Sequence, residues 1–283
     1  MYVPTTLETI KIIRPVNCLL AAVGVIVGAY LTPVSMHYYG PAMAALSAFL
    51  VCAAGNVVND LCDVEIDRVN RPDRVLVRQA LSPRYALWLS IILNLLALLN
   101  AVWLSGPVTI MVVLAIVLLL LYNLRVKRIP LAGNIIIALL GAMTFITGGL
   151  ATIPEMAWRL PGPLIPAVFA FLLHLIREIV KDIEDIEGDR ALGIITLPQK
   201  TGVRGALVLS FILLLLLAAA TIVPVWKGWY GPYYKVITLY IIDLPLTLGF
   251  LFIIARPGRK AFGIGSFALK AAMAVGAVAL ILA

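Results

Sequence analysis

The chain has 283 residues, of which 63% are hydrophobic and only 13% are charged, with a net charge of +8 and a mean hydropathy of +1.06. Soluble domains are about 45–50% apolar and roughly a quarter charged, so this composition excludes a soluble globular enzyme, a disordered chain and a disulfide scaffold. The apolar stretches are continuous and do not alternate residue by residue, which argues against a transmembrane β-barrel. We therefore expect an all-α, polytopic membrane protein with a single domain over 1–283.

Nine apolar segments have the length of a membrane-spanning helix, which needs about 20 residues to cross roughly 30 Å of hydrocarbon. The sequence therefore predicts nine transmembrane helices, which we expect to surround a central cavity. In chain order the segments cover 15–31, 42–60, 86–104, 107–123, 131–152, 162–181, 205–225, 234–255 and 262–282.

The positive charges alternate between the predicted loops. Nine helices running up and down put 18 Lys and Arg residues on the side of the N-terminus and three on the other side, and leave Lys270 inside the last helix. Cytoplasmic loops carry such an excess. We therefore expect a multi-pass protein of the cell membrane whose N-terminus and acidic loops are cytoplasmic and whose C-terminus is external. This bias and an anionic substrate explain the net charge, so we expect no nucleic-acid partner.

The acidic residues gather in two short windows. Five of the fourteen lie in 60–73 and six lie in 178–189, at the predicted cytoplasmic ends of the second and sixth spans. In the first window Asn59, Asp63 and Asp67 follow one another at intervals of four. On a helix they would form one stripe.

The second window repeats this pattern. Its four acids are spaced by four, three and four residues, so they too would share one helical stripe. Two cations, Arg177 and Lys181, flank that stripe. The acids are Glu178, Asp182, Asp185 and Asp189.

Carboxylates gathered so closely need compensation. At ~5 Å and an effective dielectric constant near 20, each like-charged pair costs about 3 kcal/mol. The acids can take up protons, pair with Arg and Lys, or hold divalent cations. Oxygen ligands favour Mg²⁺, which usually binds one or two carboxylates together with phosphate oxygens of a substrate. We therefore predict two Mg²⁺ ions that hold a diphosphate between the stripes. The candidate ligands are Asn59, Asp60, Asp63, Asp67, Glu178, Asp182, Asp185 and Asp189.

Four motifs resemble those of one known family. The pattern N-D-x-x-D-x-x-x-D at 59–67, followed by N-R-P-D-R at 70–74, resembles the first Asp-rich motif of the UbiA superfamily of intramembrane prenyltransferases. The window at 177–189 resembles the second. R-P-V-N at 14–17 and Y-N-L-R-V-K-R at 122–128 are similar to two further motifs of that superfamily. Within it, the 177–189 pattern is most similar to the branch that makes digeranylgeranylglyceryl phosphate.

This resemblance implies a Mg²⁺-dependent enzyme. It would transfer a geranylgeranyl group from geranylgeranyl diphosphate to the hydroxyl of geranylgeranylglyceryl phosphate, a lipid phosphate, to form an ether lipid within the membrane. The implied catalytic residues are Asp63, Asp67, Asp185, Asp189, Tyr122 and Lys127. The implied substrate-binding residues are Arg14, Asn17, Asn56, Arg71, Arg74, Asn123, Arg128, Arg177 and Lys181.

Two features lie outside the family pattern. The segment 75–79 reads V-L-V-R-Q where the family usually has P-x-P-S-G, so we expect a loop of different shape, with Arg78 as an added charge that suits a phosphate. Asp243 lies within the eighth span, where an acid is costly and is functional by default. Pairing with Lys270 and a role toward the substrate both remain open.

Other functions are compatible with parts of this pattern. A UbiA-type enzyme that prenylates an aromatic quinone or tetrapyrrole acceptor is the main alternative, and the altered 75–79 segment keeps it open. A transporter would place its acids near the middle of the bilayer, whereas most acids here lie at one boundary. A CDP-alcohol phosphotransferase needs a D-G-x-x-A-R type motif, which the sequence lacks.

Overall fold

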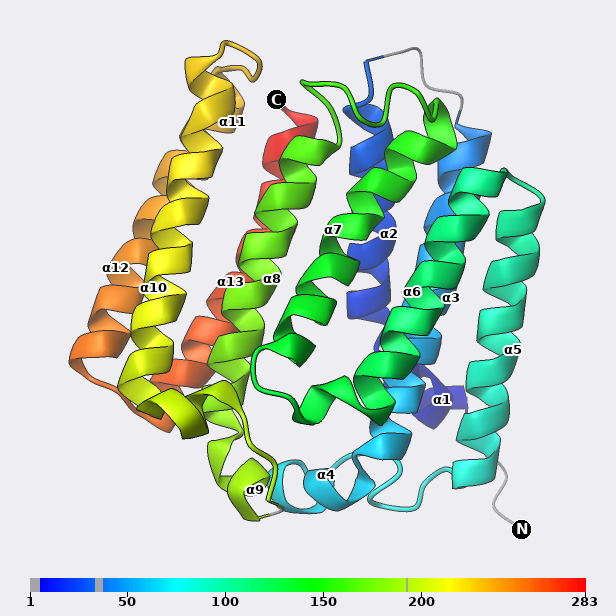
Figure 1. The fold of residues 1–283 in the computed structure, drawn as a ribbon, viewed down its shortest axis with the longest axis vertical. Helices are drawn as coiled ribbons and strands as arrows, with labels where there is room; N and C mark the ends of the chain where they lie inside the picture. The colour runs from blue at the N-terminus through cyan, green and yellow to red at the C-terminus, as the bar shows by residue number, and fades with distance from the viewer. Residues whose placement is uncertain (1–5, 34–37, 192) are drawn as a thin grey trace.

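The structure is a computed structural model that describes residues 6–33, 38–191 and 193–283. Throughout these ranges the regular structure is helical, without strands (Figure 1). The elements are α1 (Thr6–Ile13), α2 (Pro15–Tyr30), α3 (Tyr39–Cys62), α4 (Val64–Asn70), α5 (Pro83–Val102), α6 (Gly106–Leu124), the 3₁₀ turn η1 (Val126–Arg128), α7 (Ala132–Thr152), α8 (Leu164–Glu184), α9 (Ile186–Ala191), α10 (Leu197–Trp226), α11 (Pro232–Val236), the π-helical η2 (Ile237–Asp243), α12 (Leu244–Ala255) and α13 (Arg259–Ile281).

The prediction of nine spans is met only in part. In the part of the chain that the structure describes, seven helices are long and apolar enough to cross a membrane, counting Pro232–Ala255 as one, and α1 with α2 forms an eighth candidate bent by 51°. The helix α8 has the length of a span, but Arg177, Glu178 and Lys181 lie in its last turns. These charges distinguish α8 from the apolar helices. Because seven helices have the length and composition of membrane spans, the chain is a multi-pass membrane protein.

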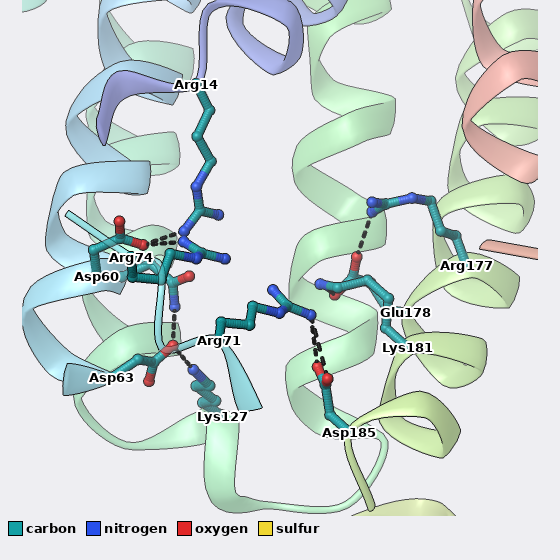
Figure 2. Close-up of polar contacts among 11 residues, drawn as sticks. Arg14, Asp60, Asp63, Arg71, Arg74, Lys127, Arg177, Glu178, Lys181 and Asp185 are labelled. Atoms are coloured by element: carbon teal, nitrogen blue, oxygen red, sulfur yellow. Dashed lines mark hydrogen bonds and ion pairs between the residues drawn. The ribbon is translucent and has the colours of Figure 1, made fainter. Parts of the chain in front are cut away.

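The bend between α1 and α2 lies at Arg14. Its backbone is in the left-handed region, with φ of 53°, which is uncommon and strained for a residue other than glycine. Pro15 follows directly and disfavours a helical conformation at the preceding residue. The interruption directs the side chain of Arg14 toward Asp60 on α3 (Figure 2).

The long helices surround a cavity of about 520 Å³ whose walls are mainly apolar. The helix α2 packs on α3 and α7, α8 packs on α7, α10 and α13, and α13 returns to α2. Backbone contact brings α2 and α7 together, because a Cβ atom on Gly148 would lie 1.9 Å from the carbonyl oxygen of Val25. The short helices α1, α4 and α9 lie at one end of the bundle, and the C-terminus lies at the other (Figure 1).

The segment that departs from the family pattern is tied to α1. Val75 and Leu76 are buried in an apolar cluster with Ile12. Arg78 is exposed, donates to the backbone oxygen of Asp73 at 2.9 Å and pairs with Glu8 at 3.1 Å. Arg78 lines neither the cavity nor the polar pocket beside it, so its expected contact with a phosphate is not what the structure shows.

Candidate active site

A polar pocket of about 90 Å³ adjoins the cavity. We call it the Asp pocket. The ends of α3 and α8, the helices α4 and α9, and the segment after α6 enclose it. Residues that line both the Asp pocket and the cavity include Arg71, Tyr122 and Lys181. The charged site is therefore continuous with an apolar space inside the bundle.

The first acidic window keeps its stripe although the helix is interrupted. The helix α3 ends at Cys62 and α4 begins at Val64, so Asp63 lies in the break with φ of −105°. The backbone N–H of Asp63 still donates to Asn59 at 3.0 Å, and that of Asp67 donates to Asp63 at 2.7 Å. Helical spacing therefore continues through the break, and all three side chains line the Asp pocket.

The second window is interrupted in the same way. The helix α8 ends at Glu184 and α9 begins at Ile186, with Asp185 between them. The backbone N–H of Asp185 donates to Lys181 at 2.9 Å, and that of Asp189 donates to Asp185 at 3.1 Å. Asp185 and Asp189 also line the Asp pocket, so the structure brings the two acidic windows to one site.

Cations connect the two windows and neutralise their central acids. Arg71, which follows α4, donates to both carboxylate oxygens of Asp185 at 2.9 and 3.3 Å (Figure 2). Asp63 accepts from Lys127 of η1, and from Asn59 at 2.8 Å. Both central acids thus have a positively charged partner from another element.

The outer acids of the windows have no such partner. Asp67 and Asp189 are 7% and 9% exposed, and no ion pair joins either to another part of the described chain. Burial, reinforced by the charge of Asp63, raises the pKa of Asp67 to about 6. Burial, reinforced by the charge of Asp185, raises the pKa of Asp189 to about 6.

The tips of the windows touch at a glycine. A Cβ atom on Gly188 of α9 would lie 2.0 Å from the side-chain oxygen of Asn70, the last residue of α4. Only a residue without a Cβ atom allows this approach while the Asn70 side chain stays in place. The contact brings α4 and α9 together, and Asp67 of α4 and Asp189 of α9 line the same pocket.

Asp60 lies apart from the other predicted metal ligands. It is 3% exposed, lies outside the Asp pocket and accepts from both Arg14 and Arg74 (Figure 2). Two guanidinium groups satisfy this buried carboxylate, as a charge inside a protein requires. Asp60 therefore positions two cations at the pocket wall.

Glu178 and Asp182, on the last turns of α8, both line the Asp pocket. Glu178 pairs with Arg177 and Lys181, each at 2.9 Å. Asp182 accepts from the amide of Asn134 at 2.9 Å. Asn134 was not among the predicted site residues, and its only signal in the sequence is a polar side chain near the start of an apolar segment.

Three predicted substrate-binding residues, Asn17, Asn56 and Asn123, line the cavity together with Tyr122, which was predicted to be catalytic. Asn123 accepts from Asn59 at 3.1 Å, and Asn56 donates to the backbone of Ile13 at 2.8 Å.

Arg128 lies apart from the other predicted substrate-binding residues. It is exposed and lines neither the Asp pocket nor the cavity. The 3₁₀ turn η1 directs Lys127 to Asp63 and leaves its neighbour on the outer surface.

The donor set of the Asp pocket fits Mg²⁺ that is shared with a phosphate. Within the described residues, no three His, Cys, Asp or Glu side chains are grouped closely enough to hold a metal ion unaided. The ligands available are carboxylate and amide oxygens, which Mg²⁺ prefers, and Mg²⁺ commonly completes its coordination with substrate phosphates and water. Two buried acids that lack an ion pair, Asp67 and Asp189, are free to contribute.

Comparisons with known proteins agree with this arrangement. The UbiA prenyltransferase family model matches residues 18–282. A digeranylgeranylglyceryl phosphate synthase of Pyrococcus abyssi is 36% identical over 277 residues, which cover 95% of this chain and 96% of that relative.

Solved structures show the same fold. One of a digeranylgeranylglyceryl phosphate synthase in membranes has a TM-score of 0.73 at 30% identity, covering 97% of this chain and 96% of its own. A UbiA homologue from Archaeoglobus fulgidus, bound to GPP and Mg²⁺, is alike in fold, with a TM-score of 0.67 at 20% identity over 96% of this chain and 99% of that one. The chain therefore belongs to the UbiA prenyltransferase family.

Proposed function

We propose that this prenyltransferase transfers a geranylgeranyl group from geranylgeranyl diphosphate to the free hydroxyl of geranylgeranylglyceryl phosphate and so forms an ether lipid. One observation carries the proposal: two acidic windows face each other at the charged end of an apolar cavity. A diphosphate fits the first environment and a prenyl chain fits the second. The cavity volume of about 520 Å³ lies in the range of roughly 300–1,000 Å³ of ligand sites.

Mg²⁺ bound in the Asp pocket would neutralise the negative charge that develops on the leaving diphosphate. Two ions are proposed because each window offers its own ligands. Asn59, Asp63 and Asp67 would hold one ion. Asp185 and Asp189 would hold the other, with Asp182 in support. The Archaeoglobus fulgidus homologue with bound GPP and Mg²⁺ supports a metal-dependent site in this fold.

The cations of the pocket have a second task. Arg71 and Lys127 pair with Asp185 and Asp63. When a diphosphate enters, these side chains can turn to its oxygens, because guanidinium and ammonium groups bind phosphate as readily as carboxylate. Arg74 and Lys181 line the same pocket. The site thus exchanges internal ion pairs for contacts with the leaving group.

The apolar walls protect the reaction. Tyr122 lies where the Asp pocket meets the cavity, and an aromatic face there stabilises an allylic cation. Exclusion of water favours the lipid acceptor over hydrolysis. The acceptor oxygen bonds to carbon 1 of the prenyl group, the bond from carbon 1 to the diphosphate breaks, and a carboxylate of the acidic windows takes the hydroxyl proton.

The proposal includes an orientation of the protein in the membrane. We place α8 and the bent pair α1–α2 across the bilayer, which makes nine crossings of one domain. The Asp pocket then lies at the cytoplasmic face, because the Lys-rich and Arg-rich loops are on that side. The anionic donor would enter from there, while the apolar cavity gives the prenyl chains a place within the bilayer.

A transfer assay tests the function. The purified protein in lipid receives radiolabelled geranylgeranyl diphosphate and either geranylgeranylglyceryl phosphate or 4-hydroxybenzoate, each with and without Mg²⁺. We expect an ether lipid only with the lipid phosphate and Mg²⁺. Product from 4-hydroxybenzoate alone would contradict the proposed acceptor and favour an aromatic one.

A further inference from the structure

A lysine inside the last helix has no acidic partner. Lys270 lies near the middle of α13, lines the cavity and donates to the side-chain oxygen of Asn17 on α2 at 2.7 Å. No carboxylate in the described parts of the chain pairs with it. Asp243, the one acid that the sequence offered as a partner, accepts instead from Thr221 at 2.8 Å. A charged group in a membrane span without a counter-ion is a functional signal.

Two arginines share this part of the cavity. Arg14 and Arg177 line the same cavity as Lys270. Figure 2 shows them approaching from opposite sides, farther into the bundle than Asp63 and Asp185. Arg177 uses one terminal nitrogen for Glu178, while its buried Nε has no hydrogen-bond partner in the structure.

The balance of charge differs between the two spaces. Six cationic and two acidic residues line the cavity, whereas five cationic and six acidic residues line the Asp pocket. The cavity is therefore net positive, although its surroundings are apolar. Asp60 and Glu178 each serve two of these cations, and Lys270 has no acidic partner among the described residues. Excess positive charge in such surroundings is costly, and an anionic ligand would offset it.

We propose that Lys270, Arg177 and Asn17, with Arg14 beside them, form a second anion subsite that binds the phosphate monoester of the acceptor lipid. This inference rests on the proposed function and assigns the acceptor end of the same site. The Asp pocket holds the diphosphate of the donor. The remaining anion in the reaction is the acceptor phosphate. Lys270 has no counter-ion among the described residues, Arg177 shares Glu178 with Lys181, and Arg14 shares Asp60 with Arg74.

The position of the subsite suits this role. Arg177 of α8 precedes Asp185, the residue that follows this helix, by eight positions. That is about 12 Å at 1.5 Å per residue, and the long side chain of Arg177 can span part of that distance. The acceptor glycerol has three carbons, so its hydroxyl and its phosphate lie within a few bonds of each other. A phosphate at Lys270 and Arg177 thus keeps the hydroxyl near carbon 1 of a donor held in the Asp pocket.

The test separates binding of the acceptor from binding of the donor. Lys270→Met removes the charge but keeps much of the apolar volume, Lys270→Arg restores the charge, and Lys260→Met changes an exposed lysine of the same helix. We expect Lys270→Met to raise KM for geranylgeranylglyceryl phosphate about ten-fold or more and to leave KM for geranylgeranyl diphosphate nearly unchanged. Lys270→Arg and Lys260→Met should stay close to the wild type.

Acceptor preference gives a second readout. The wild type should favour geranylgeranylglyceryl phosphate over dephosphorylated geranylgeranylglycerol, and Lys270→Met should lose most of that preference. Arg177→Met serves as an independent variant should Lys270→Met fail to fold, and it should shift the same acceptor KM. An unchanged acceptor KM and preference in folded Lys270→Met, or an equal rise in the KM values of donor and acceptor, would overturn the subsite.

Binding without turnover distinguishes this inference from the proposed reaction. Radiolabelled geranylgeranylglyceryl phosphate is bound to Mg²⁺-free protein, with inorganic phosphate as the competitor. Retention by the wild type and loss in Lys270→Met support the subsite even if no product forms, a result that would sink only the transfer proposal. No binding by the wild type, or displacement by inorganic phosphate at concentrations equal to the lipid, would overturn the assignment to a lipid phosphate.

Discussion

The two acidic windows have the same backbone plan but are stabilised differently. Each is interrupted at its central acid, Asp63 or Asp185, and each presents an outer acid with a raised pKa, Asp67 or Asp189. In the first window the inner acid, Asp60, binds two arginines that come from the α1–α2 bend and from the loop after α4. In the second window the inner acid is Glu178, and both of its cationic partners lie on the same helix, α8.

This difference separates two tasks. The first window joins three distant segments through Asp60, so it fixes the architecture of the site. In the second window the inner acid depends on its own helix alone, because Glu178 takes both of its cations from α8. That window can therefore present positive charge to the cavity without holding the bundle together. Two similar motifs in one sequence can therefore contribute differently to the stability of the fold and to substrate binding.

The largest effect should come from the central acids. Replacing Asp63 or Asp185 with Ala removes ligands from one wall of the Asp pocket and should lower Mg²⁺-dependent transfer by about 100-fold or more. Glu187→Ala is the matched control, because Glu187 is exposed beside the second window, and it should keep activity within about twofold. Full transfer activity in both central variants would contradict the equal role that we assign to the two windows in metal binding.

The inner acids should separate stability from binding. Asp60→Ala leaves two arginines without their buried carboxylate and should cost about 3 kcal/mol of stability, seen as a lower Tm in detergent. Glu178→Ala should lower Tm less, because its partners remain on one helix, and should act mainly on substrate KM. A larger loss of Tm in Glu178→Ala than in Asp60→Ala would reverse the division of tasks.

The outer acids should make metal binding sensitive to pH. The pKa values of Asp67 and Asp189 are raised to about 6, so protons compete with Mg²⁺ below that value. We expect the Mg²⁺ concentration for half-maximal transfer to rise as the pH falls from 7 to 5, by up to about ten-fold per unit for each acid. The metal-free fold should gain stability over the same change, since a raised carboxyl pKa means that the folded state takes up the proton first.

That comparison is checked with one variant of each outer acid. Asp67→Asn and Asp189→Asn each remove one titrating group, so each should flatten the pH dependence by a similar amount. A variant that keeps the full wild-type dependence would show that its acid does not compete with the metal.

The smallest effect should come from the contact between the windows. Gly188→Ala places a Cβ atom against the side chain of Asn70 and should raise KM for the diphosphate several-fold by moving α4 away from α9. Asn70→Ala in the same chain should restore it by making room. Gly249→Ala, where no atom lies within 4 Å of an added Cβ, is the control. A Gly188→Ala protein with wild-type KM would show that the approach of the windows is not needed.

Much of the site could be predicted from the sequence because its residues are repeated at helical spacing. The stripes of Asn59, Asp63 and Asp67 and of the second window follow from local periodicity, and the helix breaks hardly change them. The apolar segments likewise predicted the helical bundle. The count of spans differs at two places: α8 carries Arg177, Glu178 and Lys181 in its last turns, and α2 qualifies only together with α1, from which it is bent by 51°.

What could not be predicted depends on contacts between distant residues. Nothing local marks Asp60 as the partner of Arg14 and Arg74. The outward position of Arg128 follows from the 3₁₀ turn. The separate partners of Asp243 and Lys270 depend on how α10, α13 and α2 pack.

The central claim is that the two windows form one site that holds two metal ions only together with a diphosphate. Counting bound Mn²⁺, as a spectroscopic substitute for Mg²⁺, by electron paramagnetic resonance tests it most directly. We expect two ions per chain with geranylgeranyl diphosphate, fewer without it, and one ion fewer in Asp63→Ala and in Asp185→Ala. Two ions bound without the diphosphate, or two ions retained in either variant, would contradict the account.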